Sequence, residues 1–177
     1  GAAGSNGYDN GASEKGLGGN TSGNAALTSL SLGGGGGGGA GAHAGSGSRV
    51  GGDGAIGGAD LIAFAPSLTI GGAISLTGNN GADAGAAGAA GAGGGASGGS
   101  GLFGGNTVAL GTNLLTAAAG LGGTAWSGVQ YPHGGPGGIG RFAVMAPIST
   151  AVSGSVGIGY TFTVDNSFAQ PAQGFII

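Results

Sequence analysis

The sequence contains no cysteine, and its only charged residues are three lysines or arginines and six aspartates or glutamates. Without cysteine there can be no disulfide and no thiolate chemistry. The cations Lys15, Arg49 and Arg141 are too few to neutralise a row of phosphates, which excludes a nucleic-acid partner. No apolar run reaches the roughly 18 residues of a membrane-spanning helix, so no membrane span is expected.

Glycine dominates what is present. It occupies 52 of the 177 positions, about 29% against a usual 7% or so. Collagen is excluded because glycine is not at every third position and there are only five prolines. A net charge of −3 and a mean hydropathy of +0.30 also differ from a charge-driven disordered tail. The composition therefore predicts a glycine-rich chain that is too apolar to be a plain linker.

Strand-sized apolar blocks interrupt the glycine. Three blocks begin with a glycine pair, at residues 57, 104 and 137, which gives irregular spacings of 47 and 33 residues. The pair Ala65-Pro66 recurs as Ala146-Pro147, 81 residues later. These features predict a repeat architecture. We expect short strands at residues 27–32, 60–65, 68–77, 106–110, 141–146 and 154–165.

The Gly/Ala/Ser tracts between the blocks, such as residues 79–101, allow two interpretations. They are either flexible linkers or packed segments resembling the polyproline-II helix, whose outward N–H and C=O groups bond to neighbouring segments. We favour the packed form, because the returning strands would hold the ends of each segment.

The expected fold is mainly β or irregular. Short strands are linked by packed, polyglycine-II-like Gly/Ala-rich segments, and no substantial α-helix is present. Residues 1–24 are expected to form an extended N-terminal arm, residues 25–150 a glycine-rich repeat domain, and residues 151–177 a C-terminal strand with an apolar tail.

The C-terminal strand has the clearest alternation in the chain. Its apolar face and the apolar residues after it are predicted to form a subunit interface, which comprises Val156, Ile158, Tyr160, Phe162, Phe168, Phe175, Ile176 and Ile177. Only Asp165 offers a charge against edge-to-edge pairing. The alternative is that the tail folds back over its own strands.

Catalytic and metal patterns are weak. Residues 95–99 match G-x-S-x-G, but a tract of Gly, Ala and Ser produces that match by composition, and no helix accompanies it. We therefore expect no enzyme activity, no metal and no cofactor. Two alternatives stay open: calcium near Asp53 and Asp60, and zinc at His43 or His133, which lack further ligands.

One stretch is rich in aromatic and hydrogen-bonding side chains. It contains Trp126, Tyr131 and His133, a composition typical of binding loops. We predict that these residues contact a ligand or receptor. The alternative is that Trp126 and Tyr131 cover the core.

The blocks in residues 33–78 and 102–150, with Gly/Ala tracts between them, resemble glycine-rich proteins of phage tail fibres and bacterial secreted surface proteins. Residues 134–142 are similar to the last repeat of such proteins. Gly/Ala-rich mycobacterial surface proteins and springtail antifreeze proteins are similar in part. The resemblance implies a fibre or adhesin of polyglycine-II helices and short strands, with loops that touch a host receptor.

These observations predict a structural, self-associating component of an extracellular fibre or phage virion appendage, with adhesive surface loops. Its partners would be further copies of itself and a host-surface receptor, and its location extracellular, at a cell surface or on a virion. The alternative is a secreted module that binds glycans or ice.

Overall fold

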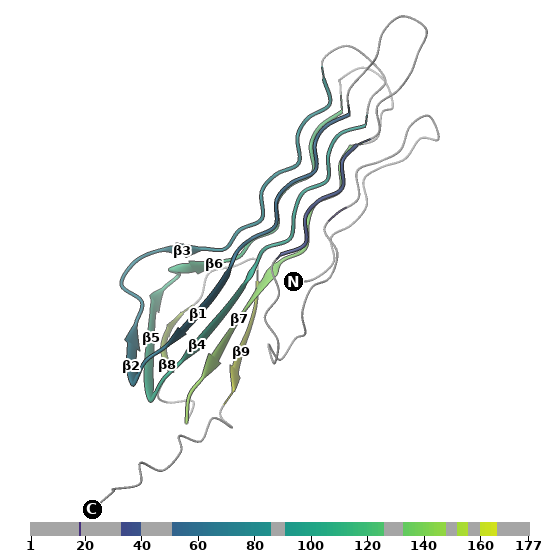
Figure 1. Ribbon diagram of the computed structural model, residues 1–177. Helices are drawn as coiled ribbons and strands as arrows, with labels where there is room; N and C mark the ends of the chain where they lie inside the picture. The colour runs from purple at the N-terminus through teal and green to yellow at the C-terminus, as the bar shows by residue number, and fades with distance from the viewer. Residues whose placement is uncertain are drawn as a thin grey trace, which may run out of the picture.

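The computed structural model describes residues 18, 33–39, 51–85, 91–125, 133–147, 152–155 and 160–165. These residues contain no helix, and every strand pair among them is parallel. A mainly β chain without a substantial helix is thus confirmed for this part of the sequence. The described chain has two regions, a group of strands and a bundle of extended segments that rises from it (Figure 1).

The strands form three parallel sheets. The first sheet has the order β1-β4-β7-β9, the second β2-β5-β8, and the third β3-β6. The strands are β1 (Asp60–Phe64), β2 (Ser67–Thr69), β3 (Ile74–Ser75), β4 (Ser100–Gly104), β5 (Thr107–Thr112), β6 (Leu115–Thr116), β7 (Gly140–Met145), β8 (Val152–Ser155) and β9 (Tyr160–Asp165). Consecutive strands thus belong to different sheets, and the chain returns to each sheet once per coil.

The repeat is regular in space. The Ser100 N–H donates to Asp60 Oδ1 across 40 residues, and the Gly138 N–H donates to Ser97 Oγ across 41. The irregular spacings of 47 and 33 were therefore wrong: residues 57–58 correspond to residues 97–98, not 104–105. The two Ala-Pro pairs stand two coils apart, because the Ala65 N–H donates to Gly104 and the Gly105 N–H donates to Met145.

Two expected strands are each divided. Residues 68–77 contain β2 and β3, which belong to different sheets. Residues 154–165 contain the end of β8 in the second sheet and β9 in the first. Gly154, with a φ of 100°, lies in the region that favours glycine, and there the chain departs from simple alternation. The sequence reading also missed β4 and β6, and the strand expected at residues 27–32 lies outside the described residues.

The hydrophobic core lies between the sheets. Its buried members are Leu76, Phe103, Val108, Leu110, Leu115, Ala117, Phe142, Val144 and Ala146. The rings of Phe103 and Phe142 stack with centroids 6.0 Å apart. The Phe142 ring covers Gly101, its register partner on β4, where a Cβ would collide with it.

Six glycine-rich segments make up the bundle, which we call the glycine bundle: residues 33–39, 51–59, 76–85, 91–99, 117–125 and 133–139. Their backbone hydrogen bonds join different segments and recur every third residue. Segment 51–59 donates to segment 91–99 from Gly52, Ala55 and Gly58 at 2.9–3.1 Å. The partners rise together along the sequence, so these two segments are parallel.

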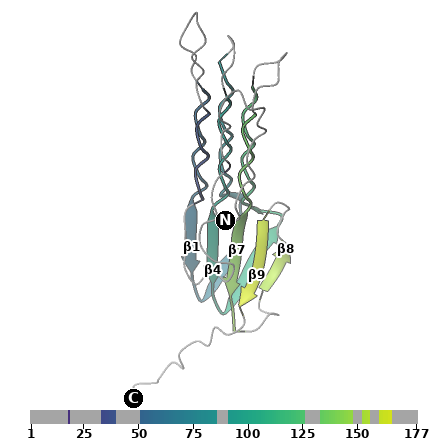
Figure 2. The same cartoon turned by 90° about the vertical axis from the view of Figure 1, so that its right-hand side faces the viewer.

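The hydrogen bonds arrange the bundle in layers. Segments 51–59, 91–99 and 133–139 are mutually parallel neighbours in the middle layer, and segments 76–85 and 117–125 form a second parallel layer. Segment 33–39 lies on the opposite side and runs antiparallel to the middle layer. Figure 2 shows the segments gathered in columns above the strands.

Segment 91–99 is the centre of the bundle, and each of its residues is buried. It is hydrogen-bonded to all five of the other segments. A Cβ at Gly93 or Gly99 would collide with the carbonyl oxygen of Asp53 or Ala59. Close approach of the backbones therefore requires glycine at these positions.

Candidate functional site

The end of the glycine bundle far from the strands is the candidate functional site. Three pairs of segment ends meet there: residues 39 and 51, residues 85 and 91, and residues 125 and 133 (Figure 1). Hydrogen bonds link these ends directly, from Gly39 to Gly52 at 2.8 Å, from Gly52 to Gly91 at 2.9 Å, and from Ala84 to Thr124 at 3.1 Å. The anchors of three chain connections are therefore held together by one backbone network.

Polar side chains near this end accept hydrogen bonds from backbone N–H groups. Asn80 Oδ1 accepts from Leu121 at 2.8 Å, and Asp83 Oδ1 accepts from Thr124 at 2.6 Å. The two acceptors are three residues apart and bind donors three residues apart, which matches the spacing of the backbone bonds. They fasten segment 117–125 to segment 76–85 along the outer layer.

His133 occupies a similar place on the neighbouring segment. Its Nδ1 accepts a hydrogen bond from the Ala125 N–H at 3.1 Å, which requires an unprotonated Nδ1. His133 is exposed and joins the two ends of the connection that contains Trp126 and Tyr131. Trp126 and Tyr131 themselves lie outside the described residues, so their contact role stays a prediction.

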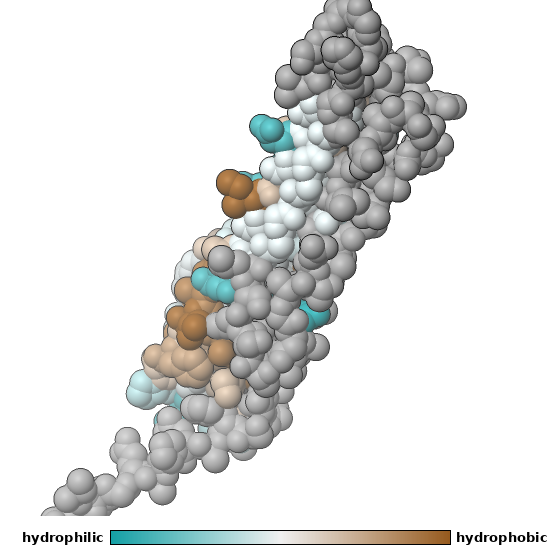
Figure 3. All heavy atoms as spheres, turned by 45° about the vertical axis from the view of Figure 1, so that its right-hand side comes forward, coloured by the Kyte–Doolittle hydropathy of each residue, from teal (hydrophilic) through white to brown (hydrophobic). Residues whose placement is uncertain are grey.

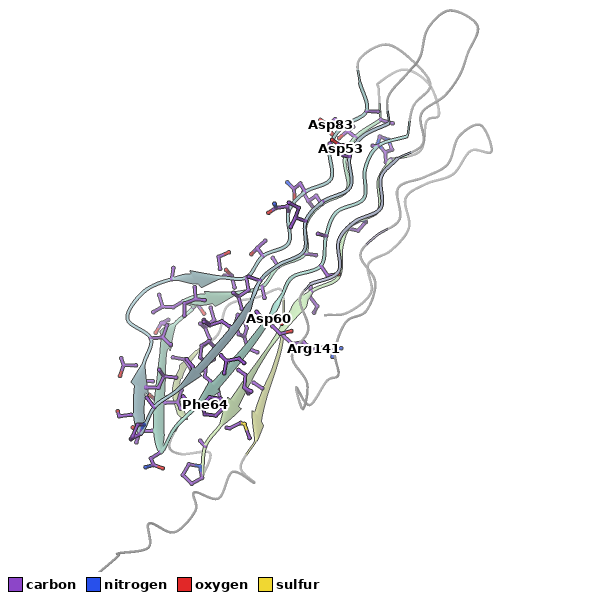
Figure 4. The ribbon with its side chains drawn as sticks, viewed as in Figure 1. Asp53, Asp60, Phe64, Asp83 and Arg141 are labelled. Atoms are coloured by element: carbon purple, nitrogen blue, oxygen red, sulfur yellow. The ribbon has the colours of Figure 1, made fainter. Side chains whose placement is uncertain are left out.

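The two aspartates of the calcium alternative are not brought together. Asp53 and Asp60 lie seven residues apart on one extended segment, which corresponds to about 20 Å. Asp53 lies beside Asp83 near the far end of the bundle, whereas Asp60 lies at its junction with the strands (Figure 4). Among the described residues, no three histidine, cysteine or acidic side chains are grouped to hold a metal.

Asp60 performs a structural task at that junction. Its Oδ1 accepts a hydrogen bond from the Ser100 N–H at 3.2 Å, between the first and second coils. Burial raises the pKa of the Asp60 carboxyl, and the hydrogen bond from Ser100 opposes that rise. The raised pKa thus has a local structural cause.

Ser97, the serine of the G-x-S-x-G match, is fully buried in segment 91–99. Its Oγ accepts a hydrogen bond from Gly138 at 3.2 Å, and it lies on an extended segment instead of a strand–turn–helix elbow. The match therefore reflects composition and packing.

The predicted interface residues are only partly described. Tyr160 and Phe162 lie on β9, which pairs with β7 of the same chain. Val156, Ile158, Phe168, Phe175, Ile176 and Ile177 lie outside the described residues. The sequence reading missed Asn80 and Asp83, although their three-residue spacing beside a glycine tract was a usable signal.

Comparison with protein-family models, curated proteins and solved structures gives no match. Within the described ranges, no helix is both long enough and apolar enough to cross a membrane.

Proposed function

We propose that the glycine bundle is a packed set of polyglycine-II-like helices. The support is the three-residue recurrence of hydrogen bonds between segments, which matches the threefold repeat of that helix. Side-chain exposure follows the same period on segment 51–59, where Asp53, Ile56 and Ala59 are exposed. Circular dichroism with a polyproline-II signature would test the assignment, and a random-coil spectrum would contradict it.

We further propose that the protein is a structural, self-associating component of an extracellular fibre or virion appendage, with adhesive loops. The observation that supports this most is the shared position of the three connections 40–50, 86–90 and 126–132. Their anchors stand together at the end of a hydrogen-bonded bundle, far from the hydrophobic core. Binding residues are commonly carried on loops that a rigid scaffold positions.

The scaffold suits this task physically. Most of the described bundle surface is near neutral in hydropathy, and the hydrophobic surface gathers over the strands (Figure 3). A long bundle of this kind holds its loops away from the body of the protein without needing a second hydrophobic core. The connection with Trp126 and Tyr131 is the best candidate contact, because aromatic residues dominate binding energy in many interfaces.

Cell binding tests the adhesive part. The labelled full chain would be mixed with a panel of intact bacterial cells, and bound protein measured by flow cytometry. On any strain that the wild type binds, replacing both Trp126 and Tyr131 by alanine should weaken binding at least tenfold, because hot-spot side chains contribute about 2 kcal/mol. The matched control is Ile56→Ala, an exposed apolar residue on the side of the bundle. Equal losses in both variants, or none, would contradict the proposed contact.

A further inference from the structure

Strand β1 is the outermost strand of the first sheet. Among the described strands it has a neighbour on one side only, β4 (Figure 2). The Ala65 N–H donates to Gly104 in the extension of β4, so alternate residues before it, Ala63 and Leu61, also face β4. The backbone N–H and C=O of Ile62 therefore point away from β4, toward the outer edge.

This edge has few of the features that normally protect sheet edges. The pairing of β1 with β4 runs through five consecutive residues without a bulge. The strand contains no proline or lysine, and its one charge, on Asp60, already accepts a hydrogen bond from Ser100. Ile62 is 58% exposed in the middle of the strand. The edge can thus accept another extended strand.

The side of the bundle above β1 has the opposite property. Its exposed positions carry the side chains of Asp53, Ile56 and Ala59, and Ile56 is 75% exposed. The equivalent positions of the second coil, 40 residues later by the register of β1 and β4, are Gly93, Ala96 and Gly99. Glycine is needed there because the backbone of segment 51–59 packs directly against it. The outer side of segment 51–59 therefore cannot receive another segment in the same way.

These two features select how a second strand can add. A copy added parallel to β1, as β4 is, would bring its glycine bundle against the closed side of segment 51–59. A copy added antiparallel would point its bundle in the other direction and avoid that side. We propose that two copies of this chain pair antiparallel through β1, about a twofold axis at Ile62.

The register of this pair is favourable. With Ile62 opposite Ile62, Asp60 of one copy faces Phe64 of the other, so no like charges are opposed. The first sheets of both copies then join into one sheet. The contact is isologous, and it closes after two copies. It names the contact for the self-association in the proposed function, on which it rests, and it differs from the predicted C-terminal interface.

Cross-linking tests the geometry directly, because the natural chain has no cysteine. Opposite residues of an antiparallel pair have Cα atoms about 4.5–5.5 Å apart, within the range that a disulfide spans. The Ile62→Cys variant, oxidised with diamide, should form a covalent dimer. The Ile56→Cys variant, equally exposed but on the closed side of the bundle, should remain a single chain on denaturing gels.

Light scattering gives the independent measurement. The full chain should show twice its mass of 15.8 kDa. Ile62→Lys places two ammonium groups together at the twofold axis and should halve the mass, whereas Ile56→Lys should leave it unchanged. Circular dichroism checks that both variants fold, and if Ile62→Lys does not fold, the cross-linking result decides.

The outcomes separate two failures. A wild type that is a single chain at all accessible concentrations overturns the self-association of the proposed function, and this inference with it. A wild-type oligomer that neither cross-links at position 62 nor responds to Ile62→Lys overturns only the β1 contact. Dissociation on deletion of residues 174–177 would then assign the interface to the C-terminal tail.

Discussion

The strand region and the glycine bundle are stabilised by different means. The strand region buries a cluster of large apolar side chains around Phe103 and Phe142. In the bundle, the buried hydrophobic cluster that the structure describes consists of Ala84 and Ala92 alone. The bundle depends instead on hydrogen bonds between backbones that only glycine allows to approach. Removing atoms should therefore damage the first region, and adding atoms should damage the second.

Deleting a core ring is the largest effect that the comparison predicts. Phe103 is completely buried in the first sheet, and Phe103→Ala should reduce the free energy of unfolding by about 3–5 kcal/mol. Urea denaturation followed by intrinsic fluorescence would measure it. Ile56→Ala, on an exposed side chain of the bundle, is the control and should change stability by less than about 0.5 kcal/mol. Similar losses in the two variants would remove the distinction between the regions.

Adding one methyl group to the bundle should come next. A Cβ at Gly98 would collide with the carbonyl of Ala117 in a segment that is buried on all sides. Gly98→Ala should cost about 1–3 kcal/mol, the usual range for overpacking.

Gly71→Ala is the matched control, because nothing lies within 4 Å of a Cβ at that position. That variant should stabilise the protein by about 0.4–1 kcal/mol through the unfolded chain. Equal behaviour of the two alanine variants would mean that the bundle segments are not packed as described.

The same difference decides what the sequence could predict. Alternation of apolar residues located β1 and β7, because half of each strand faces a hydrophobic core. It missed β4, since Gly101 and Gly104 occupy positions where neighbouring rings replace a side chain. It also merged β2 with β3, because apolar periodicity does not report a change of sheet.

The bundle was predictable in kind but not in layout. Glycine content indicated that backbones could pack closely. The order of the layers depends on hydrogen bonds between segments about 40 residues apart, such as Gly58 to Ser97 and Gly98 to Gly138, and one glycine is indistinguishable from another in sequence. For the candidate site, the sequence singled out His133 but could not indicate that three connections share one end.

Side-chain acceptors on the bundle should contribute less than its glycines. Asp83 Oδ1 receives the Thr124 N–H on the exposed outer layer, so Asp83→Ala should cost about 0.5–1.5 kcal/mol. Asp83→Asn keeps the acceptor oxygen and should retain most of the wild-type stability. Thermal melts of the two variants would show the difference. An equal loss in both would assign the effect to charge instead of to the hydrogen bond.

The smallest effect concerns the junction of the two regions, where burial raises the pKa of Asp60 above its ordinary value of 3.8. The folded protein therefore holds this proton more tightly than the unfolded chain, and stability falls as pH rises from about 3.8 through the folded pKa. Asp60→Asn keeps an oxygen for the Ser100 N–H and removes the charge. The variant should melt slightly higher than the wild type at pH 7, and the difference should vanish below the ordinary pKa. A lower melting temperature at pH 7 would show that the charge strengthens the Ser100 hydrogen bond by more than its burial costs.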